Sequence, residues 1–154
     1  MNYSATGLSP HPEGGRFREV FRSPLDVELS TGKKRSALTH IYFALNQGEC
    51  SRFHRVCHDE IWNLYQGLSL KLWIMGPGDS GPQLVELSPA SRTFCAVVPA
   101  GFWQAAEAVN NDVLVGCSVA PGFDFEDFEL ISDEHPEAQI LRDQGFAHLV
   151  DLCP

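Results

Sequence analysis

The chain has 154 residues, of which 44% are hydrophobic, and a formal net charge of −9. This length and hydrophobic content predict one globular domain over residues 1–154 and exclude a disordered or fibrous chain. The acidic balance argues against nucleic acid and anionic membranes as partners, because binding to their phosphate groups needs a basic surface.

Short strands bounded by turn residues dominate the pattern. Thirteen Gly and ten Pro indicate frequent turns. We predict strands at residues 17–22, 37–45, 52–56, 61–65, 68–74, 84–87, 94–98, 103–109 and 113–119. The polar stretch 25–34 is predicted to be a loop, and residues 110–112 are a candidate hairpin turn. Many short strands at this spacing are typical of a sandwich or barrel.

Three further segments complete the predicted organisation. Residues 76–81 match the pattern G-x-G-x-x-G, but a proline and another strand follow, which favours a hairpin loop over a dinucleotide site. Residues 123–130 alternate aromatic and acidic side chains, as an edge strand does, and Asp127 could instead close over a site and pair with His54 or an arginine. A helix is predicted over 137–143, because Pro136 precedes it and Gly145 follows it.

The cysteines and the N-terminal residues predict a cytoplasmic location. The N-terminal stretch lacks the apolar core of a secretory signal, and no run reaches the ~20 apolar residues of a membrane span. The five cysteines are odd in number and form no C-x-x-C pair. This usage is typical of reduced thiols in a cytoplasmic protein.

The segment 48–67, GECSRFHRVCHDEIWNLYQG, carries the clearest functional signal. It predicts a strand hairpin that begins at Gly48 and ends at Gly67. His54 and Glu60 fall at even spacing, so a continuous strand would aim both side chains at one face. An imidazole and a carboxylate in one cavity can bind a metal ion or transfer a proton.

The spacing of this segment resembles the first motif of the cupin superfamily, with Val56 replacing a histidine, and residues 99–104 (PAGFWQ) resemble the second motif. The resemblance extends to HPEGG at 11–15, DEIW at 59–62, PAGFW at 99–103 and PGFDFEDFE at 121–129, which are similar to motifs of a group of small cupins of unassigned function. It implies an all-β jelly-roll barrel with a short C-terminal helix, a site in the barrel mouth, and a homodimer.

The ligand positions implied by the resemblance depart from those of metal-binding cupins, which use three histidines and one glutamate. When the ligand positions of the family are transferred to this sequence, they fall on His54, Val56, Glu60 and Gln104. Valine has no lone pair to donate, and a neutral amide oxygen is a poor ligand for a transition metal. We therefore expect no bound metal cofactor. The alternative is a divalent transition metal held by His54, Glu60 and an inward-turned His58, although a hairpin position favours exposure of His58.

Other residues near the pair are candidates for ligand contact. Arg52 is two residues from His54, so in a regular strand it would point to the same face, where it could hold an anion. Trp62 is likewise two residues from Glu60 and could form a wall of the ligand site. The predicted ligand-binding residues are Arg52, Trp62, Trp103 and Gln104. The predicted catalytic residues are His54, Glu60 and Tyr42, the last as a proton-returning acid, with Tyr65 as the other candidate for that role.

Three functions remain open at this point. The first is binding of a small polar ligand, sugar-like or nucleotide-like, in the barrel without metal. The second is a metal-independent sugar epimerase or isomerase that uses His54 as general base. The third is a metal-dependent cupin enzyme that uses His54, Glu60 and, if it turns inward, His58.

Overall fold

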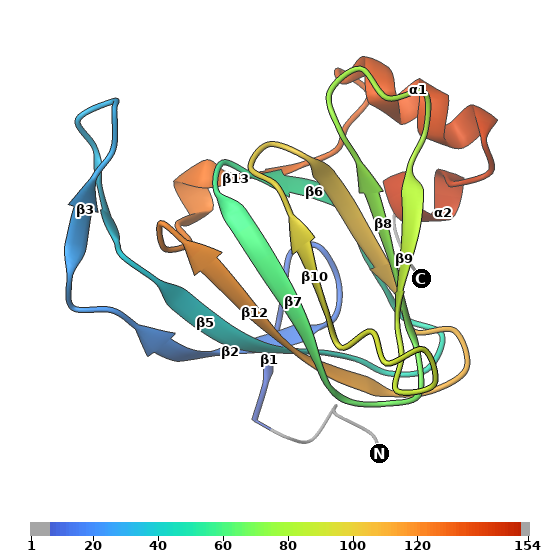
Figure 1. Cartoon of the computed structure of the whole chain (residues 1–154). Helices are drawn as coiled ribbons and strands as arrows, with labels where there is room; N and C mark the ends of the chain where they lie inside the picture. The colour runs from blue at the N-terminus through green and yellow to red at the C-terminus, as the bar shows by residue number, and fades with distance from the viewer. Residues whose placement is uncertain (1–6, 152–154) are drawn as a thin grey trace.

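The computed structural model describes residues 7–151 and consists mainly of two antiparallel sheets that face each other (Figure 1). The six-stranded sheet has the order β1 (Ser9–Pro10), β2 (Arg16–Arg22), β5 (Thr39–Leu45), β12 (Val113–Ala120), β7 (Asp59–Gln66) and β10 (Cys95–Val98). The five-stranded sheet has the order β13 (Phe128–Leu130), β6 (Cys50–Val56), β11 (Trp103–Glu107), β8 (Leu70–Met75) and β9 (Gln83–Leu87). The predicted all-β jelly-roll class is confirmed.

A third, two-stranded sheet corrects the predicted loop over residues 25–34. Strands β3 (Asp26–Glu28) and β4 (Lys34–Ser36) pair as a hairpin that projects from the body of the molecule (Figure 1). Strand β3 buries neither of its faces. Its three residues, Asp-Val-Glu, are too few for the apolar alternation by which a strand is recognised.

The predicted hairpin over residues 48–67 is also wrong, because its two strands belong to different sheets. Strand β6 pairs with β11 and β13, whereas β7 pairs with β12 and β10. His54 and Glu60 therefore reach the interior from opposing sheets, not from one face of one strand. The turn at 110–112 likewise connects β11 and β12 across the two sheets. In contrast, residues 76–81 form the predicted hairpin loop between the paired strands β8 and β9.

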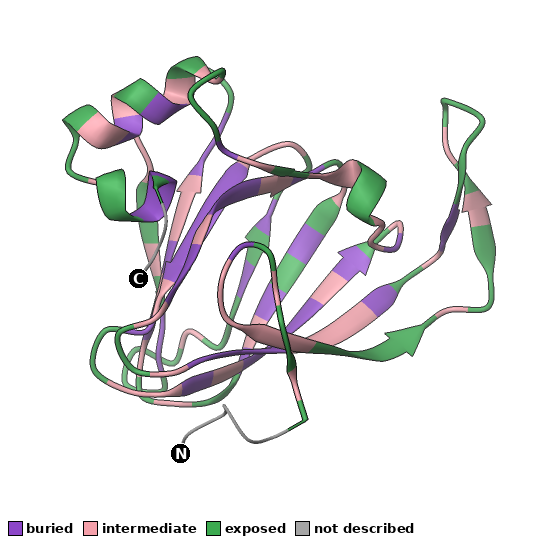
Figure 2. Cartoon of the chain, turned by 180° about the vertical axis from the view of Figure 1, so that it is seen from behind, coloured by how far each residue is buried: buried purple, intermediate pink, exposed green. Residues whose placement is uncertain are grey.

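Two short helices cover the outer face of the five-stranded sheet. Helix α1 (Pro136–Asp143) starts at the predicted proline, and α2 (Ala147–Val150) was not predicted. Their buried residues, coloured purple in Figure 2, pack in one cluster with Phe53 and Trp103 of the sheet. Because helices cover one face and the opposing sheet covers the other, β6 and β11 are buried on both sides.

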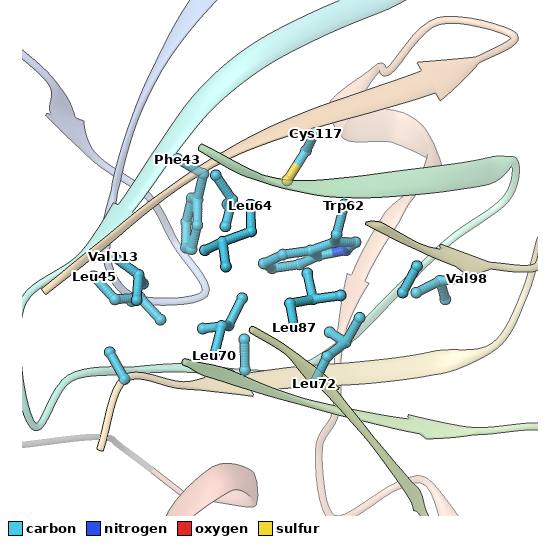
Figure 3. Close-up of a cluster of buried hydrophobic side chains, with 14 residues drawn as sticks. Phe43, Leu45, Trp62, Leu64, Leu70, Leu72, Leu87, Val98, Val113 and Cys117 are labelled. Atoms are coloured by element: carbon cyan, nitrogen blue, oxygen red, sulfur yellow. The ribbon is translucent and has the colours of Figure 1, made fainter. Parts of the chain in front are cut away.

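The main hydrophobic core lies between the two sheets (Figure 3). Trp62, Phe43 and Leu70 are among its side chains, each at most 1% exposed.

Among the described cysteines, Cys57, Cys95 and Cys117 are free thiols. Cys50 is disulfide-bonded, so the prediction of reduced thiols is wrong for this residue. No helix in residues 7–151 has the length and hydropathy needed to span a membrane.

Candidate functional site

A bulge in β6 decides which of its side chains reach the interior. Gln104 on β11 pairs with His54, whereas Ala106 pairs with Ser51, so two residues of β6 stand opposite one residue of β11. An extra residue of this kind interrupts the alternation of a strand. Ser51 and His54 consequently both face the interior. Arg52, which parity alone had placed beside His54, donates instead to the carbonyl oxygen of Val150 in α2 at 3.1 Å.

The loop between β1 and β2 inserts a carboxyl group next to this bulge. The backbone N–H of Arg52 donates to the carbonyl oxygen of Glu13 at 2.8 Å, and the Ser51 hydroxyl donates to Glu13 Oε1 at 2.9 Å. Gly14 has φ +109°, and a Cβ at this position would collide with the Cys50 carbonyl oxygen. The loop therefore requires glycine to lie this close to β6. Glu13 is only 5% exposed as a result.

Glu13 and His54 form a buried, neutral, hydrogen-bonded pair. His54 Nδ1 lies 2.7 Å from the Arg52 carbonyl oxygen, which can only accept, so Nδ1 carries the ring proton. The bare Nε2 faces Glu13 Oε2 at 3.1 Å. Burial raises the pKa of Glu13 well above its usual value, and the nearby Glu60 raises it further. Burial lowers the pKa of His54 to about 3. Burial therefore favours the neutral pair, in which the Glu13 carboxyl O–H donates a hydrogen bond to His54 Nε2.

His11 extends this pair on the same loop. Its Nδ1 accepts the backbone N–H of Glu13 at 3.3 Å and lies 3.3 Å from Glu13 Oε2. Burial lowers the pKa of His11 to about 4. The imidazole packs edge-on against Phe17, with ring centroids 4.7 Å apart. The loop thus contributes the His11 imidazole and the Glu13 carboxyl group, which lie beside the His54 imidazole of β6, and burial favours the uncharged form of all three.

Glu60 occupies the opposite wall, on β7. Gln104 Nε2 donates to Glu60 Oε2 at 2.6 Å, and the orientation of this amide is fixed because Trp62 Nε1 donates to Gln104 Oε1 at 2.7 Å. The thiol of Cys117, on β12, also hydrogen-bonds to Glu60. Burial raises the pKa of Glu60 to about 7, although both hydrogen bonds act in the opposite direction. Glu60 is therefore a carboxyl group that changes charge near neutral pH.

These groups line one cavity of about 40 Å³. Its titratable lining residues are His11, Glu13, His54, Glu60 and Cys117, and its aromatic walls are Phe17, Phe43, Phe123 and Phe128. The remaining lining is Thr39 and aliphatic side chains, and no Lys or Arg within residues 7–151 is among them. The space exceeds the roughly 10–15 Å³ that one water needs by about threefold.

The segment over residues 123–129 covers the mouth of the cavity. It contains a 3-10 turn, η2 (Phe125–Asp127), and contributes Phe123 and Phe128 to the cavity wall. Arg35 on β4 clamps Asp127 through two hydrogen bonds of 2.8 and 3.0 Å. Asp127 thus pairs with an arginine and not with His54, and it is not among the residues that line the cavity. Both Phe17 and Phe123 also line an adjacent surface hollow of about 340 Å³.

The structure brings together only part of the predicted residue set. His54 and Glu60 line the cavity, and Gln104 hydrogen-bonds to Glu60 from behind its wall. Trp62 belongs to the hydrophobic core and reaches the site only through Gln104. Arg52 lies on the helix-covered side of the sheet, as described above.

Tyr42 and Trp103 lie outside the cavity for the same reason, the alternation of side chains along a strand. Ile41 and Phe43 face the cavity, so Tyr42 between them faces outward. There its ring packs edge-on against the ring of Tyr65, with the two ring centroids 6.0 Å apart. Neither tyrosine can return a proton to a ligand in the cavity. Trp103 packs in the cluster beneath the helices, with the Arg55 guanidinium 4.4 Å from its ring centroid.

The donor set fits a transition metal poorly. Val56 lines the cavity and offers no lone pair, and Gln104 directs its amide nitrogen, not its oxygen, toward Glu60. His58 lies outside the cavity lining and pairs with Asp127 at 3.3 Å, so it cannot join His54 and Glu60. No group of three His, Cys, Asp or Glu residues in the described part of the chain is arranged to hold a metal ion.

Sequence reasoning missed three titratable lining residues, His11, Glu13 and Cys117. Cys117 follows Val113 and Val115 at even spacing on β12, so parity could have placed it inside. Glu13 and His11 precede β2 in a loop, where no periodicity applies. The resemblance included HPEGG at 11–15 but gave its side chains no role in the site.

Comparisons with known proteins agree with this architecture. A family model described as the cupin superfamily (DUF985) matches residues 3–131. A hypothetical protein from Leishmania major is 30% identical, with a TM-score of 0.77 over 96% of this chain and 93% of that one. Protein SO0799 from Shewanella oneidensis is 32% identical, with a TM-score of 0.77 over 96% and 91%.

A yeast relative has an equally uninformative name. The uncharacterized protein YML079W of Saccharomyces cerevisiae is 27% identical, over 95% of this chain and 81% of its own length. None of these three names assigns an activity or a ligand. The matched family model covers most of the chain, and the chain therefore belongs to the cupin superfamily (DUF985).

Proposed function

We propose that this cupin binds a small polar molecule in the cavity between Glu60 and the Glu13–His54 pair, without a metal ion. The observation that carries the proposal is the opposition of these buried polar groups across a cavity with aromatic walls. A concave, largely apolar site with a few convergent polar groups and shifted pKa values is the usual form of a ligand site. The Arg35 clamp on Asp127 would hold the mouth segment over the bound molecule.

The cavity lining favours some of the predicted ligand classes over others. A nucleotide carries phosphate groups, which proteins usually bind with Arg, Lys or a helix N-terminus. No such cation lines the cavity in the described residues. Hydroxyl or amine groups suit the carboxyl and imidazole groups better. A ligand larger than the cavity would extend past Phe123 into the adjacent hollow, where Arg22 is already paired with Glu19.

A second candidate function is proton transfer, as in an epimerase or isomerase. The pKa of about 7 favours this function, because a carboxylate that ionises near neutral pH is an efficient general base. Glu60 replaces His54 in that role, since the His54 nitrogen facing the cavity already accepts a hydrogen bond from the Glu13 carboxyl group. Glu60 would take a proton from a ligand carbon, and the Glu13 carboxyl group would return one from the β1–β2 loop beside His54.

A thermal-shift screen of polar metabolites tests the binding function. A ligand at about 100 times its Kd stabilises a protein by about 2.7 kcal/mol, which corresponds to roughly 5–10 °C for a domain of this size. We expect such shifts to disappear in Val119→Phe, which fills the cavity, and to persist in Val97→Phe, where the side chain is 55% exposed. Equal shifts in both variants would refute binding in the cavity.

Solvent deuterium incorporation separates binding from catalysis. If the chain transfers protons, a bound compound should gain deuterium at one carbon in heavy water. Glu60→Gln should abolish this exchange while the compound still binds. Binding without exchange would leave the chain a binding protein.

A further inference from the structure

We infer that the cavity selects a small organic cation, a group such as an alkylammonium ion, over neutral or anionic molecules of the same size. The inference rests on the proposed binding function and adds the charge of the ligand. It follows from the composition of the cavity wall, the hydrogen-bond partners of its two carboxyl groups, and the chemistry of its aromatic side chains.

The first argument is the uncompensated acidity of the cavity. The wall holds the carboxyl groups of Glu13 and Glu60, both less than 10% exposed. Neither has a Lys or Arg partner within residues 7–151: Glu13 meets Ser51 and two uncharged imidazoles, and Glu60 meets Gln104 and a thiol. Buried carboxylates normally require a cationic partner. A cationic ligand would supply it.

The second argument is the contrast with carboxylates elsewhere in the chain. At the mouth, Asp127 has Arg35 and His58, and near the start of β6 Glu49 has Arg16 at 2.8 Å. The chain thus pairs these partly exposed carboxylates and leaves the two most buried ones without a cation. Burial and the proximity of Glu60 both raise the pKa of Glu13, which is the expected consequence of a missing counter-charge.

The third argument distinguishes an organic cation from a metal ion. A metal ion needs several oxygen, nitrogen or sulfur ligands, and the amide oxygen of Gln104 is already occupied by Trp62. An alkylammonium ion needs fewer hydrogen bonds and gains from aromatic side chains around its methyl groups. Phe17, Phe43, Phe123 and Phe128 provide this environment. The volume of about 40 Å³ limits the enclosed group to a few heavy atoms.

Binding of a cation should release a proton. Below the pKa of Glu60 the empty cavity holds this carboxyl group in its neutral form. An ammonium ion that enters favours the carboxylate, so the Glu60 proton leaves to the buffer while the nitrogen keeps its own protons. The titratable groups that share the cavity with Glu60 are His11, Glu13, His54 and Cys117. Burial keeps both imidazoles uncharged and raises the thiol pKa well above its usual value, so near neutral pH the released proton comes from a carboxyl group.

The test compares alkylammonium ions of about two to five heavy atoms with alcohols of the same shape, since ligands this small bind with Kd values in the micromolar to millimolar range. Ligand-observed NMR at pH 8 should show the ammonium binding about tenfold tighter than its alcohol. Glu60→Gln and Glu13→Gln should each weaken ammonium binding by about tenfold and leave the alcohol unchanged. Glu134→Gln, at an exposed position, is the matched control and should change neither.

Two measurements on the unmodified chain keep the test independent of how the variants fold. Ammonium affinity should fall from pH 8 to pH 5, because the carboxyl groups become protonated. Calorimetry near neutral pH, in buffers of different ionisation enthalpy, should detect proton release on ammonium binding and none on alcohol binding. Equal affinity for the two members of a pair, or affinity that does not respond to pH, would overturn the inference.

The outcomes separate this inference from the proposed function. If alcohols or polyols bind, Val119→Phe abolishes their binding, and ammonium ions do not bind, the ligand is neutral and only the inference about charge fails. If neither class binds and no metabolite responds to Val119→Phe, both fail. If ammonium ions bind equally well to Val119→Phe, they bind outside the cavity and the inference also fails.

Discussion

The two ends of the space between the sheets are built on the same strands yet differ in chemistry. Along β5 the inward residues change from Leu45 and Phe43 to Thr39, and along β7 they change from Leu64 and Trp62 to Glu60. One end is filled with hydrocarbon (Figure 3). The other end holds the cavity with its carboxyl, imidazole and thiol groups.

This difference shows how one pair of sheets divides stability from function. Burial of hydrocarbon stabilises the fold at the closed end. Burial of Glu13 and Glu60 without a cation costs stability at the mouth, and such costs are retained where they serve a site. The connection between the two ends is Trp62, whose N–H orients Gln104 toward Glu60.

The largest effect is expected from a cavity made at the hydrocarbon end. Leu70→Ala should lower the free energy of unfolding by about 2–5 kcal/mol, because this side chain is fully buried in the core. Urea unfolding measures the loss. Leu84→Ala on the neighbouring β9 is the matched control, because Leu84 is 44% exposed and should cost less than about 0.5 kcal/mol. Similar losses in both variants would contradict the assignment of Leu70 to the core.

The opposite change is expected at the mouth, where Glu60→Gln should stabilise the chain at alkaline pH. The pKa of Glu60 is raised to about 7, so the folded state retains a proton that the unfolded state releases above its usual pKa. Stability is therefore lost as pH rises through about 7. Removing the carboxyl group should recover up to about 3 kcal/mol at pH 8 and progressively less toward pH 5.

Urea unfolding of the two chains over this pH range tests the sign of that effect. His11 and His54, with lowered pKa values, destabilise the fold as pH falls below about 6.5. They are present in both chains, so the difference between the chains isolates Glu60. Glu134→Gln should show no such pH-dependent gain. A variant less stable than the parent chain at pH 8 would mean that Glu60 is held as a favourable carboxylate.

Much of the hydrocarbon end could be predicted from the sequence, because strand alternation and turn residues are local signals. The strands around Phe43, Trp62 and Val115 were all expected, and the observed bounds differ from the expected ones by one or two residues. The same reasoning failed where two strands that are consecutive in sequence lie in different sheets. Nothing local in residues 48–67 reveals that β6 and β7 are not paired with each other.

The site was less predictable, because tertiary features decide it. The bulge opposite Ala105 reverses the parity of Arg52, and only the pairing of β6 with β11 reveals it. Glu13 enters through a loop whose close approach to β6 depends on Gly14. The choice of His54 as the general base assumed an ordinary imidazole pKa, which complete burial lowers. Each error arose from a contact between segments that are distant in sequence.

The smallest effect, and the one that would convert the mouth into a different kind of site, is expected from Val56→His. Val56 lines the cavity two residues after His54, at the position where the cupin motif carries a histidine. The variant would add an imidazole to His54 and Glu60 and complete three ligands, the number that open zinc sites use. Zinc or nickel affinity measured by calorimetry should rise by about tenfold or more.

The double variant Val56→His with His54→Ala identifies the source of any gain. It keeps the added imidazole and removes its partner, so the gain in affinity should disappear if both nitrogens bind the ion. A gain that persists would place the metal elsewhere on the surface. No gain in the single variant would mean that a metal ion cannot displace the Glu13 hydrogen bond from the His54 imidazole. In that case Glu13→Gln in the Val56→His background should restore binding.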